Sequence, residues 1–178
     1  INLILQNIKQ TTGKIKIDNE DLSNYKIDDL KNLISVSFQE NYIFSGTLEN
    51  NFKLYNKNIS KEKMYEICKI ADLNEFIENK NKEKLDFRII DGGKNISGGQ
   101  KQRISIANAL SKDFDILILD DSFSSMDIRT EKEVKQAIEE NYKDKTIILI
   151  SQKISTIKNS DNIIVMKSGK IIAEGKHD

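Results

Sequence analysis

The segment "DILILDDSFSSMDIRTEKEVKQAIEENYKDKTIILIS", residues 115–151, decides the fold class. It contains two short apolar runs, DILILD and TIILIS, and between them the polar stretch RTEKEVKQAIEENY, which is predicted to be a helix. Asp127 stands just before this stretch, where a side chain can cap a helix. A strand, a crossover helix and a second strand, with continuous apolar runs in both strands, indicate a parallel sheet that is covered on both faces.

Strands are also predicted on either side of this segment. LISVSF, residues 33–38, has the apolar and β-rich character of a buried strand and ends at Gln39. NIIVMKSGKIIAEG, residues 162–175, predicts a hairpin that turns at Ser168 and Gly169.

Helices are predicted in three further segments. SKEKMYEICKIADLNEFIENK, residues 60–80, begins with the cap candidate Ser60 and repeats apolar residues with the spacing of one helix face, at Met64, Ile67, Cys68 and Ala71. GQKQRISIANAL, residues 99–110, and INLILQNI, residues 1–8, also have helical character, and a short strand is predicted at residues 14–17. The α/β sheet lobe is therefore expected to be interrupted by a helical insert.

The composition excludes several classes of protein. The 28 Lys and Arg residues balance the 28 Asp and Glu residues and are spread along the chain, which argues against a nucleic-acid partner. A single cysteine, Cys68, excludes a disulfide framework and is expected to be a buried structural thiol. No apolar run approaches the roughly 20 residues of a membrane-spanning helix, so a membrane anchor would lie in another segment or chain. Since the chain begins with Ile1 in an apolar segment and stops without a terminating signal, we expect a fragment at both ends.

Two acidic side chains end the predicted strand DILILD. Asp120 and Asp121 follow a buried apolar run, and the carboxyl ends of parallel strands are where α/β proteins form a crevice. One carboxylate there could hold Mg²⁺ through water, and the other could orient or deprotonate an attacking water. The alternative interpretation is that two adjacent aspartates simply begin a loop and cap the next helix.

A glycine turn, Ser97–Gln100, opens the predicted helix at residues 99–110. Ser-Gly-Gly before a helix leaves backbone N–H groups bare beside a positive dipole end, so Gly98 and Gly99 would let a phosphate approach and Ser97 could donate a hydrogen bond. Gln39, at a strand tip, could similarly reach a metal ion or a water. The alternatives are a flexible loop for the glycines and a solvated loop side chain for Gln39.

Taken together, these stretches resemble the nucleotide-binding domain of ATP-binding cassette (ABC) transporters over nearly the whole chain. NISGGQKQR is similar to the signature loop of the family, with Ile96 in the usual leucine place, ILILDD is similar to its Walker B strand, and SSMD is similar to its D-loop. Gln39 matches the Q-loop glutamine, and Gln152 stands at the position of the switch histidine. IFSGTLENN and DGGKNISGGQ resemble the exporter branch more than importers or DNA-repair relatives.

Two departures and one absence are informative. The phosphate-binding loop G-x-x-x-x-G-K-[ST] is not found in residues 1–178, so the fragment is expected to begin just after it and to bind ATP poorly alone. Asp121 stands where active members of the family have glutamate, and it is one methylene shorter. Gln152 can donate a hydrogen bond to a phosphate oxygen but carries no titratable proton. Both changes are expected to weaken hydrolysis, by some hundredfold or more for a misplaced carboxylate, and to keep binding.

The resemblance implies a mostly parallel α/β lobe of the P-loop NTPase type, truncated at its N-terminus, with an inserted α-helical signature subdomain. The lobe would comprise residues 1–44 and 111–178, and the subdomain residues 45–110. ATP and Mg²⁺ are the implied cofactors, with Asp120 and Gln39 on the metal. The implied nucleotide contacts are Gln39, Ser97, Gly98, Gly99, Gln100, Asp120 and Asp127, and the catalytic pair is Asp121 and Gln152.

In this family two domains bind two ATP molecules head to tail, so the resemblance implies a second ABC nucleotide-binding domain as partner. The altered pair Asp121 and Gln152 beside an intact glycine turn predicts an asymmetric heterodimer with slow hydrolysis at this chain's own site. An ABC-type ATPase fused to an upstream transmembrane domain, at the cytoplasmic side of the cell membrane, is expected. The alternatives are a homodimeric export ATPase, and a non-transport ABC protein in DNA repair or in regulation.

Overall fold

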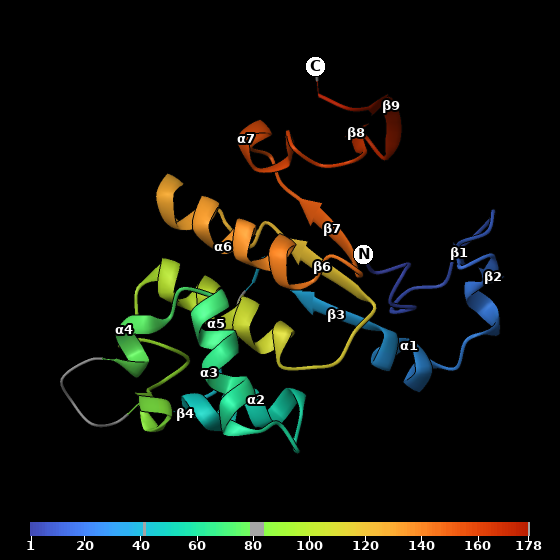
Figure 1. Ribbon diagram of the computed structural model, residues 1–178. Helices are drawn as coiled ribbons and strands as arrows, with labels where there is room; N and C mark the ends of the chain where they lie inside the picture. The colour runs from blue at the N-terminus through green and yellow to red at the C-terminus, as the bar shows by residue number, and fades with distance from the viewer. Residues whose placement is uncertain (41, 79–83, 178) are drawn as a thin grey trace.

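The computed structural model describes residues 1–40, 42–78 and 84–177 (Figure 1). Its strands are β1 (Lys16–Ile17), β2 (Glu20–Asp21), β3 (Ile34–Ser37), β4 (Gly46–Thr47), β5 (Arg88–Ile89), β6 (Ile116–Asp120), β7 (Thr146–Ile150), β8 (Ile163–Lys167) and β9 (Lys170–Gly175). Its α-helices are α1 (Ile27–Leu33), α2 (Leu48–Tyr55), α3 (Lys61–Ile70), α4 (Asn74–Ile77), α5 (Gly98–Leu110), α6 (Ile128–Asn141) and α7 (Ile154–Ile157). Short 3-10 helices lie at η1 (Leu22–Asn24) and η2 (Lys84–Asp86).

A parallel sheet in the order β3-β6-β7 lies at the centre of the molecule. Its register places Ile34 opposite Ile116 and Asp120 opposite Ile150, so the three strands end at the same edge. Helix α6 connects β6 to β7, which is the crossover helix predicted within residues 115–151. These parallel strands and their helical connection confirm the α/β class predicted from the sequence.

The sheet is covered on both faces, as the alternation of side chains along β6 shows. Leu117 and Leu119 belong to the larger apolar cluster, which includes side chains of α2 to α6. Ile118 points to the opposite face and belongs to a second cluster with Ile34 of β3 and Leu30 of α1. Because both faces are apolar, the strand sequence is a continuous aliphatic run.

Side-chain caps fix the starts of α3 and α6. The Ser60 side chain accepts a hydrogen bond from the Lys63 amide, and the Asp127 side chain accepts from the amides of Arg129 and Thr130. Both caps were predicted from the sequence and are confirmed. In Figure 1, α2 to α5 form a group of helices next to α6, on one side of the sheet.

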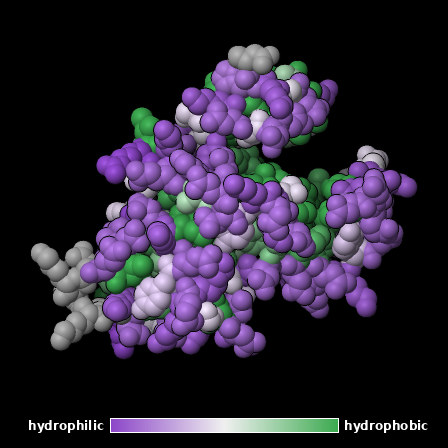
Figure 2. All heavy atoms as spheres, in the orientation of Figure 1, coloured by the Kyte–Doolittle hydropathy of each residue, from purple (hydrophilic) through white to green (hydrophobic). Residues whose placement is uncertain are grey.

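Strands β8 and β9 form the predicted antiparallel hairpin. The turn residues Ser168 and Gly169 have φ values of 48° and 75°, which suit a tight two-residue turn. Aliphatic side chains are exposed on this hairpin, namely Ile164, Val165, Met166, Ile171 and Ile172. Figure 2 shows apolar atoms where the surface is hollowed next to the hairpin.

The helix predicted at residues 1–8 is wrong. These residues form turns, in which Gln6 has a φ of 54° and donates a side-chain hydrogen bond to the Leu22 carbonyl. A segment this short has little helical stability of its own, so a tertiary contact and one left-handed residue decide its conformation. The strand predicted at residues 14–17 is confined to β1.

The helix predicted at residues 60–80 is also shorter than expected. It ends at Ile70, since Asp72 has a φ of 51°, and the separate helix α4 follows. Residues 79–80 of that prediction lie outside the described residues. A left-handed residue ends an α-helix because its N–H and C=O can no longer continue the i to i−4 ladder.

The predicted division into a lobe, residues 1–44 and 111–178, and a helical subdomain, residues 45–110, stays a prediction. One apolar cluster crosses the predicted boundary, since Ile104 of α5 shares it with Leu119 of β6. In the part of the chain that the structure describes, every helix is too short or too polar to cross a membrane.

Candidate functional site

Polar side chains that follow β3 and β6 meet at the carboxyl edge of the sheet. Gln39 lies two residues beyond β3, and Asp121 directly follows β6. Gln39 Nε2 donates to Asp121 Oδ2 over 3.5 Å, although 82 positions separate the two residues. This bond uses the amide nitrogen, so the amide oxygen of Gln39 stays available as a ligand. The structure therefore brings two of the predicted site residues together.

Asp120 and Gln152 lie at the same edge of the sheet. Asp120 is the last residue of β6 and pairs with Ile150, the last residue of β7. Gln152 follows Ile150 by two positions and is exposed. Each of the three parallel strands thus has a predicted site residue at its carboxyl end or within two residues of it.

Asp121 has an unusual and well-fixed backbone. Its φ of 48° lies in the left-handed region, which aspartate tolerates better than most side chains. Its amide donates to the Ile150 carbonyl over 2.9 Å, and its carbonyl accepts from the Ser124 amide and hydroxyl over 3.3 and 3.0 Å. With both backbone groups held, the main chain of Asp121 is fixed, and the length of its side chain sets how far the carboxylate can reach.

Buried serine hydroxyls hold the ends of β3 and β6 to α5. Ser122 Oγ donates to the Ser37 carbonyl over 3.2 Å, and Ser37 Oγ lies 3.0 Å from both Ser122 Oγ and Ser105 Oγ. Ser35 Oγ donates to the Ala109 carbonyl of the same helix over 2.7 Å. These hydroxyls satisfy one another in the core and fix the strand ends that carry the site. Sequence reasoning missed them, although alternating serines in the apolar strand ISVS were a signal.

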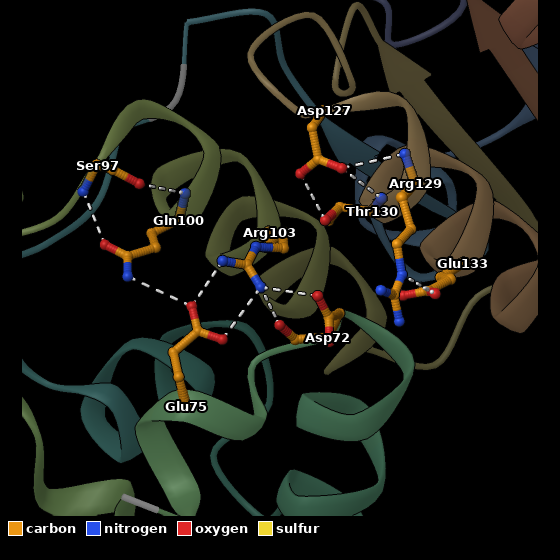
Figure 3. Close-up of polar contacts among 9 residues, drawn as sticks. All are labelled: Asp72, Glu75, Ser97, Gln100, Arg103, Asp127, Arg129, Thr130 and Glu133. Carbon is orange, nitrogen blue, oxygen red and sulfur yellow. Dashed lines mark hydrogen bonds and ion pairs between the residues drawn. The ribbon is translucent and has the colours of Figure 1, made fainter.

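The glycine turn begins α5 and is closed by reciprocal hydrogen bonds (Figure 3). Ser97 Oγ accepts from the Gln100 amide over 3.2 Å, and Gln100 Oε1 accepts from the Ser97 amide over 2.8 Å. This capping box satisfies the outer amides and leaves those of Gly98 and Gly99 for an acceptor outside the helix. The helix dipole adds positive potential there, so the turn suits an anion.

Gly99 also allows the glycine turn to approach the segment that follows β6. A Cβ at Gly99 would lie 3.1 Å from the Ser125 carbonyl oxygen, which is closer than ordinary contact. A Cβ at Gly98 would lie 3.6 Å from Ser125 Cβ, which is an ordinary van der Waals distance. Packing therefore favours glycine at residue 99, where the Ser125 carbonyl would have to move by a few tenths of an ångström to admit a Cβ, and does not favour it at residue 98.

Arg103 ties the glycine turn to the residues around α4 (Figure 3). Arg103 Nη2 donates to Glu75 Oε1 over 2.6 Å, and Nη1 donates to the carboxylate and the carbonyl of Asp72. Gln100 Nε2 donates to the same Glu75 oxygen over 3.3 Å. The Arg103 side chain is only 12% exposed, so solvent screens these ion pairs less than surface pairs. Gln100, predicted as a nucleotide contact, thus also has a structural role.

Asp127 is occupied as the cap of α6. Its Oδ1 accepts from the amides of Arg129 and Thr130, each over 3.0 Å, and its Oδ2 accepts from the Thr130 hydroxyl over 2.7 Å (Figure 3). The hydrogen bonds from Thr130 are the main cause that holds the pKa of Asp127 below its usual range. The carboxylate is exposed, so capping leaves it accessible from solvent.

Two residues outside the predicted set hold the segment Ser124–Asp127. Gln102 of α5 contacts it through hydrogen bonds to Ser124 and Ser125. Lys153 Nζ donates to the Ser124 carbonyl over 3.3 Å and lies 3.7 Å from a Glu131 carboxylate oxygen, so it connects the tip of β7 to this segment. In the sequence both are ordinary polar residues, and only the fold reveals their contacts.

The donors at the sheet edge fit a hydrated Mg²⁺ ion. Asp120 offers carboxylate oxygens and Gln39 an amide oxygen, and both are hard ligands of the kind that Mg²⁺ prefers. This ion usually keeps several waters and takes few protein ligands beside substrate phosphates. Among the described residues, no group of three or more His, Cys, Asp or Glu side chains is arranged to hold a metal ion by itself. The amides of Gly98 and Gly99, which the capping box leaves unused, fit a phosphate oxygen.

The chain belongs to the ABC transporter family, whose model matches residues 1–124. It is 35% identical to P-glycoprotein 14 of Caenorhabditis elegans over all 178 residues, and 38% identical to an ATP-dependent lipid A-core flippase of Pectobacterium atrosepticum over 93% of the chain. Among solved structures, that of a bacterial Atm1-family ABC exporter with ATP bound matches 99% of the chain with a TM-score of 0.93 and 27% identity. The family and fold implied by the sequence motifs are thus confirmed.

The chain spans only part of these proteins. It covers 13% of the P-glycoprotein, 28% of the flippase and 31% of the solved exporter chain.

Proposed function

We propose that residues 1–178 form the ATP-binding part of an ABC exporter subunit, at the cytoplasmic side of the cell membrane and joined to a transmembrane domain. The observation that carries this proposal is the meeting of Gln39 and Asp121, 3.5 Å apart, beside Asp120 at one edge of a parallel sheet. The relatives named as exporter and flippase support the direction of transport. In this proposal residues 45–110 are a helical subdomain, and the remaining residues form the ATP-binding lobe.

At the chain's own site, Asp120 and Gln39 would hold Mg²⁺-ATP. The metal would supply charge stabilisation of the phosphate oxygens. The carboxylate of Asp121 would orient the attacking water, but it would stop one methylene short of the position that a glutamate carboxylate reaches. Gln152 would donate a hydrogen bond to a phosphate oxygen but could not take up a proton. The fixed backbone of Asp121 supports slow turnover. Because its main chain is held by hydrogen bonds, it cannot move toward the attacking water to compensate for the shorter side chain.

At the opposite site, the glycine turn Ser97–Gln100 and Asp127 would complete the site of a second nucleotide-binding domain. The amides of Gly98 and Gly99, which the capping box does not use, lie at a helix start and support a role toward phosphate. Since the glycine turn is complete and the pair Asp121 and Gln152 is altered, the partner is proposed to be a different chain with a fully active site.

The test restores the altered pair in the full-length transporter. Asp121→Glu together with Gln152→His in this subunit should add turnover at a second site, seen as two vanadate-trapped nucleotides per dimer in place of one. Restored positioning should raise turnover at this site by about a hundredfold. A matched control, Asp161→Glu with Gln136→His at exposed positions, makes the same chemical changes away from the sheet edge and should change neither quantity.

Two outcomes would contradict the proposal. An unchanged number of trapped nucleotides in a folded double variant would remove the slow-site argument. Brisk hydrolysis by the unaltered full-length chain without any second protein would favour a homodimeric ATPase.

A further inference from the structure

Gln102 is a buried polar side chain that joins α5 to the turn after β6. It is 4% exposed. Its Nε2 donates to Ser124 Oγ over 2.7 Å and to the Asp121 carbonyl over 3.4 Å, and its Oε1 accepts from the Ser125 amide over 2.8 Å. Both ends of the amide are therefore used, and all three partners belong to one five-residue stretch of backbone.

The same face of α5 carries the glycine turn. Gly98 and Gly99 precede Gln102 by four and three residues, so the three residues lie on one side of the helix. Gly99 meets the Ser125 carbonyl so closely that an added Cβ would lie 3.1 Å from it. The glycine turn and the stretch from Asp121 to Ser125 thus contact each other twice, once through a backbone approach and once through Gln102.

We infer that Gln102 is a positioning residue that fixes the backbone of Asp121 and Ser125 to the helix carrying the glycine turn, and so couples the two nucleotide sites of the dimer. This inference rests on the proposed function, in which Asp121 serves the chain's own site and the glycine turn serves the partner's site. Gln102 itself contacts no nucleotide in this arrangement. A displacement of either loop would be transmitted to the other because both are held by one buried amide.

The experiment places Gln102→Met in this subunit of the full-length transporter. Methionine keeps the length of the side chain and removes all three hydrogen bonds. We expect kcat to fall about tenfold or more, since loss of positioning near 1 Å reduces rates strongly, while KM for ATP changes less than about threefold. Vanadate trapping at the partner's site should fall as well, although that site receives no Gln102 atom.

Matched variants separate positioning from stability. Gln136→Met changes an exposed glutamine of α6 and should leave kcat and trapping unchanged. Ser124→Ala removes one partner of Gln102 and tests the same link if Gln102→Met fails to fold. The double variant that combines Gln102→Met with Ser124→Ala should have nearly the same kcat as Gln102→Met alone, because both changes break the same contact.

The inference would be overturned if the folded Gln102→Met protein kept kcat and partner-site trapping within twofold of wild type. If that variant does not fold, the same result for a folded Ser124→Ala protein would overturn it. So would a rise in KM alone. Failure of the slow-site proposal can be told apart from failure of this inference. The former would appear as equal turnover at both sites of the unaltered transporter, whereas the ratio of kcat between the Gln102→Met variant and wild type tests the role of Gln102.

Discussion

Two neighbouring glycines of the turn are expected to respond in opposite ways to the same substitution. At Gly98 an added methyl would meet Ser125 Cβ at 3.6 Å, and at Gly99 it would meet the Ser125 carbonyl oxygen at 3.1 Å. The Ser125 amide is already held by Gln102 over 2.8 Å, so this backbone cannot yield freely. Both glycines lie in the first turn of α5, which makes them a matched pair.

The magnitudes follow from two opposing terms. Alanine stabilises a helix interior by about 1 kcal/mol relative to glycine. Gly98 and Gly99 are the first two residues of α5, so the gain is smaller than this and applies to both substitutions. Overpacking against a fixed neighbour costs about 1–3 kcal/mol, and this cost applies to Gly99→Ala alone. We therefore expect Gly98→Ala to be neutral or stabilising and Gly99→Ala to be destabilising by up to about 2 kcal/mol.

Hydrogen exchange of the α5 amides in the full-length protein measures this difference. Protection should stay equal or rise in Gly98→Ala and should fall by up to about 30-fold in Gly99→Ala. In the proposed function, Gly98→Ala should nevertheless reduce hydrolysis at the partner's site, because the methyl group would occupy the approach of a phosphate. Equal protection in the two variants would refute the packing argument, and full activity of Gly98→Ala would refute the phosphate role.

Three further predictions concern ion pairs, a thiol and a carboxylate. Arg103→Met should destabilise the chain by about 2–3 kcal/mol, because it leaves the partly shielded carboxylates of Asp72 and Glu75 without their cation. The Arg129 side chain is 86% exposed, so Arg129→Met should change the thermal midpoint little, and equal shifts for the two variants would contradict this reasoning. Cys68 is buried, which raises its pKa to about 12, so thiol reagents at pH 8 should label it only after unfolding, as mass spectrometry would show. Because the pKa of Asp127 is lowered in the fold, its contribution to stability is complete above the ordinary aspartate pKa and is lost as pH falls through the lowered value. Asp127→Asn should therefore flatten the acid limb of the unfolding curve, and an unchanged limb would count against this capping role.

The central sheet could be predicted from the sequence because its physics is local. The run DILILD is aliphatic without alternation and forms β6, the central strand, whose middle residues are buried. The run TIILIS has the same pattern and forms a strand too, but β7 lies at the edge of the sheet and is only partly buried. The meeting of Gln39 and Asp121 could also be anticipated, since the carboxyl ends of parallel strands share an edge. Helix starts at Ser60 and Asp127 followed from side-chain caps that act within three residues.

Other features depend on contacts that a linear pattern does not contain. The first eight residues have helical spacing, yet Gln6 is left-handed and bonds to Leu22 across the fold. Helix α1 was not predicted. The left-handed backbone of Asp121 has no signal in the sequence, except that aspartate tolerates the left-handed region of φ/ψ space better than most residues. Gln102 looked like any helical glutamine, because its three partners lie about twenty residues away in the chain.

The C-terminal hairpin has a consequence for the colloidal behaviour of the chain. Its two strands pair with each other, and Met166 and Ile171 are 64% and 60% exposed. Unpaired backbone along a strand rim, next to aliphatic side chains, is a template on which strands of other molecules can add. Molecules of the 178-residue chain by itself are therefore expected to associate at high concentration through the outer edges of β8 and β9.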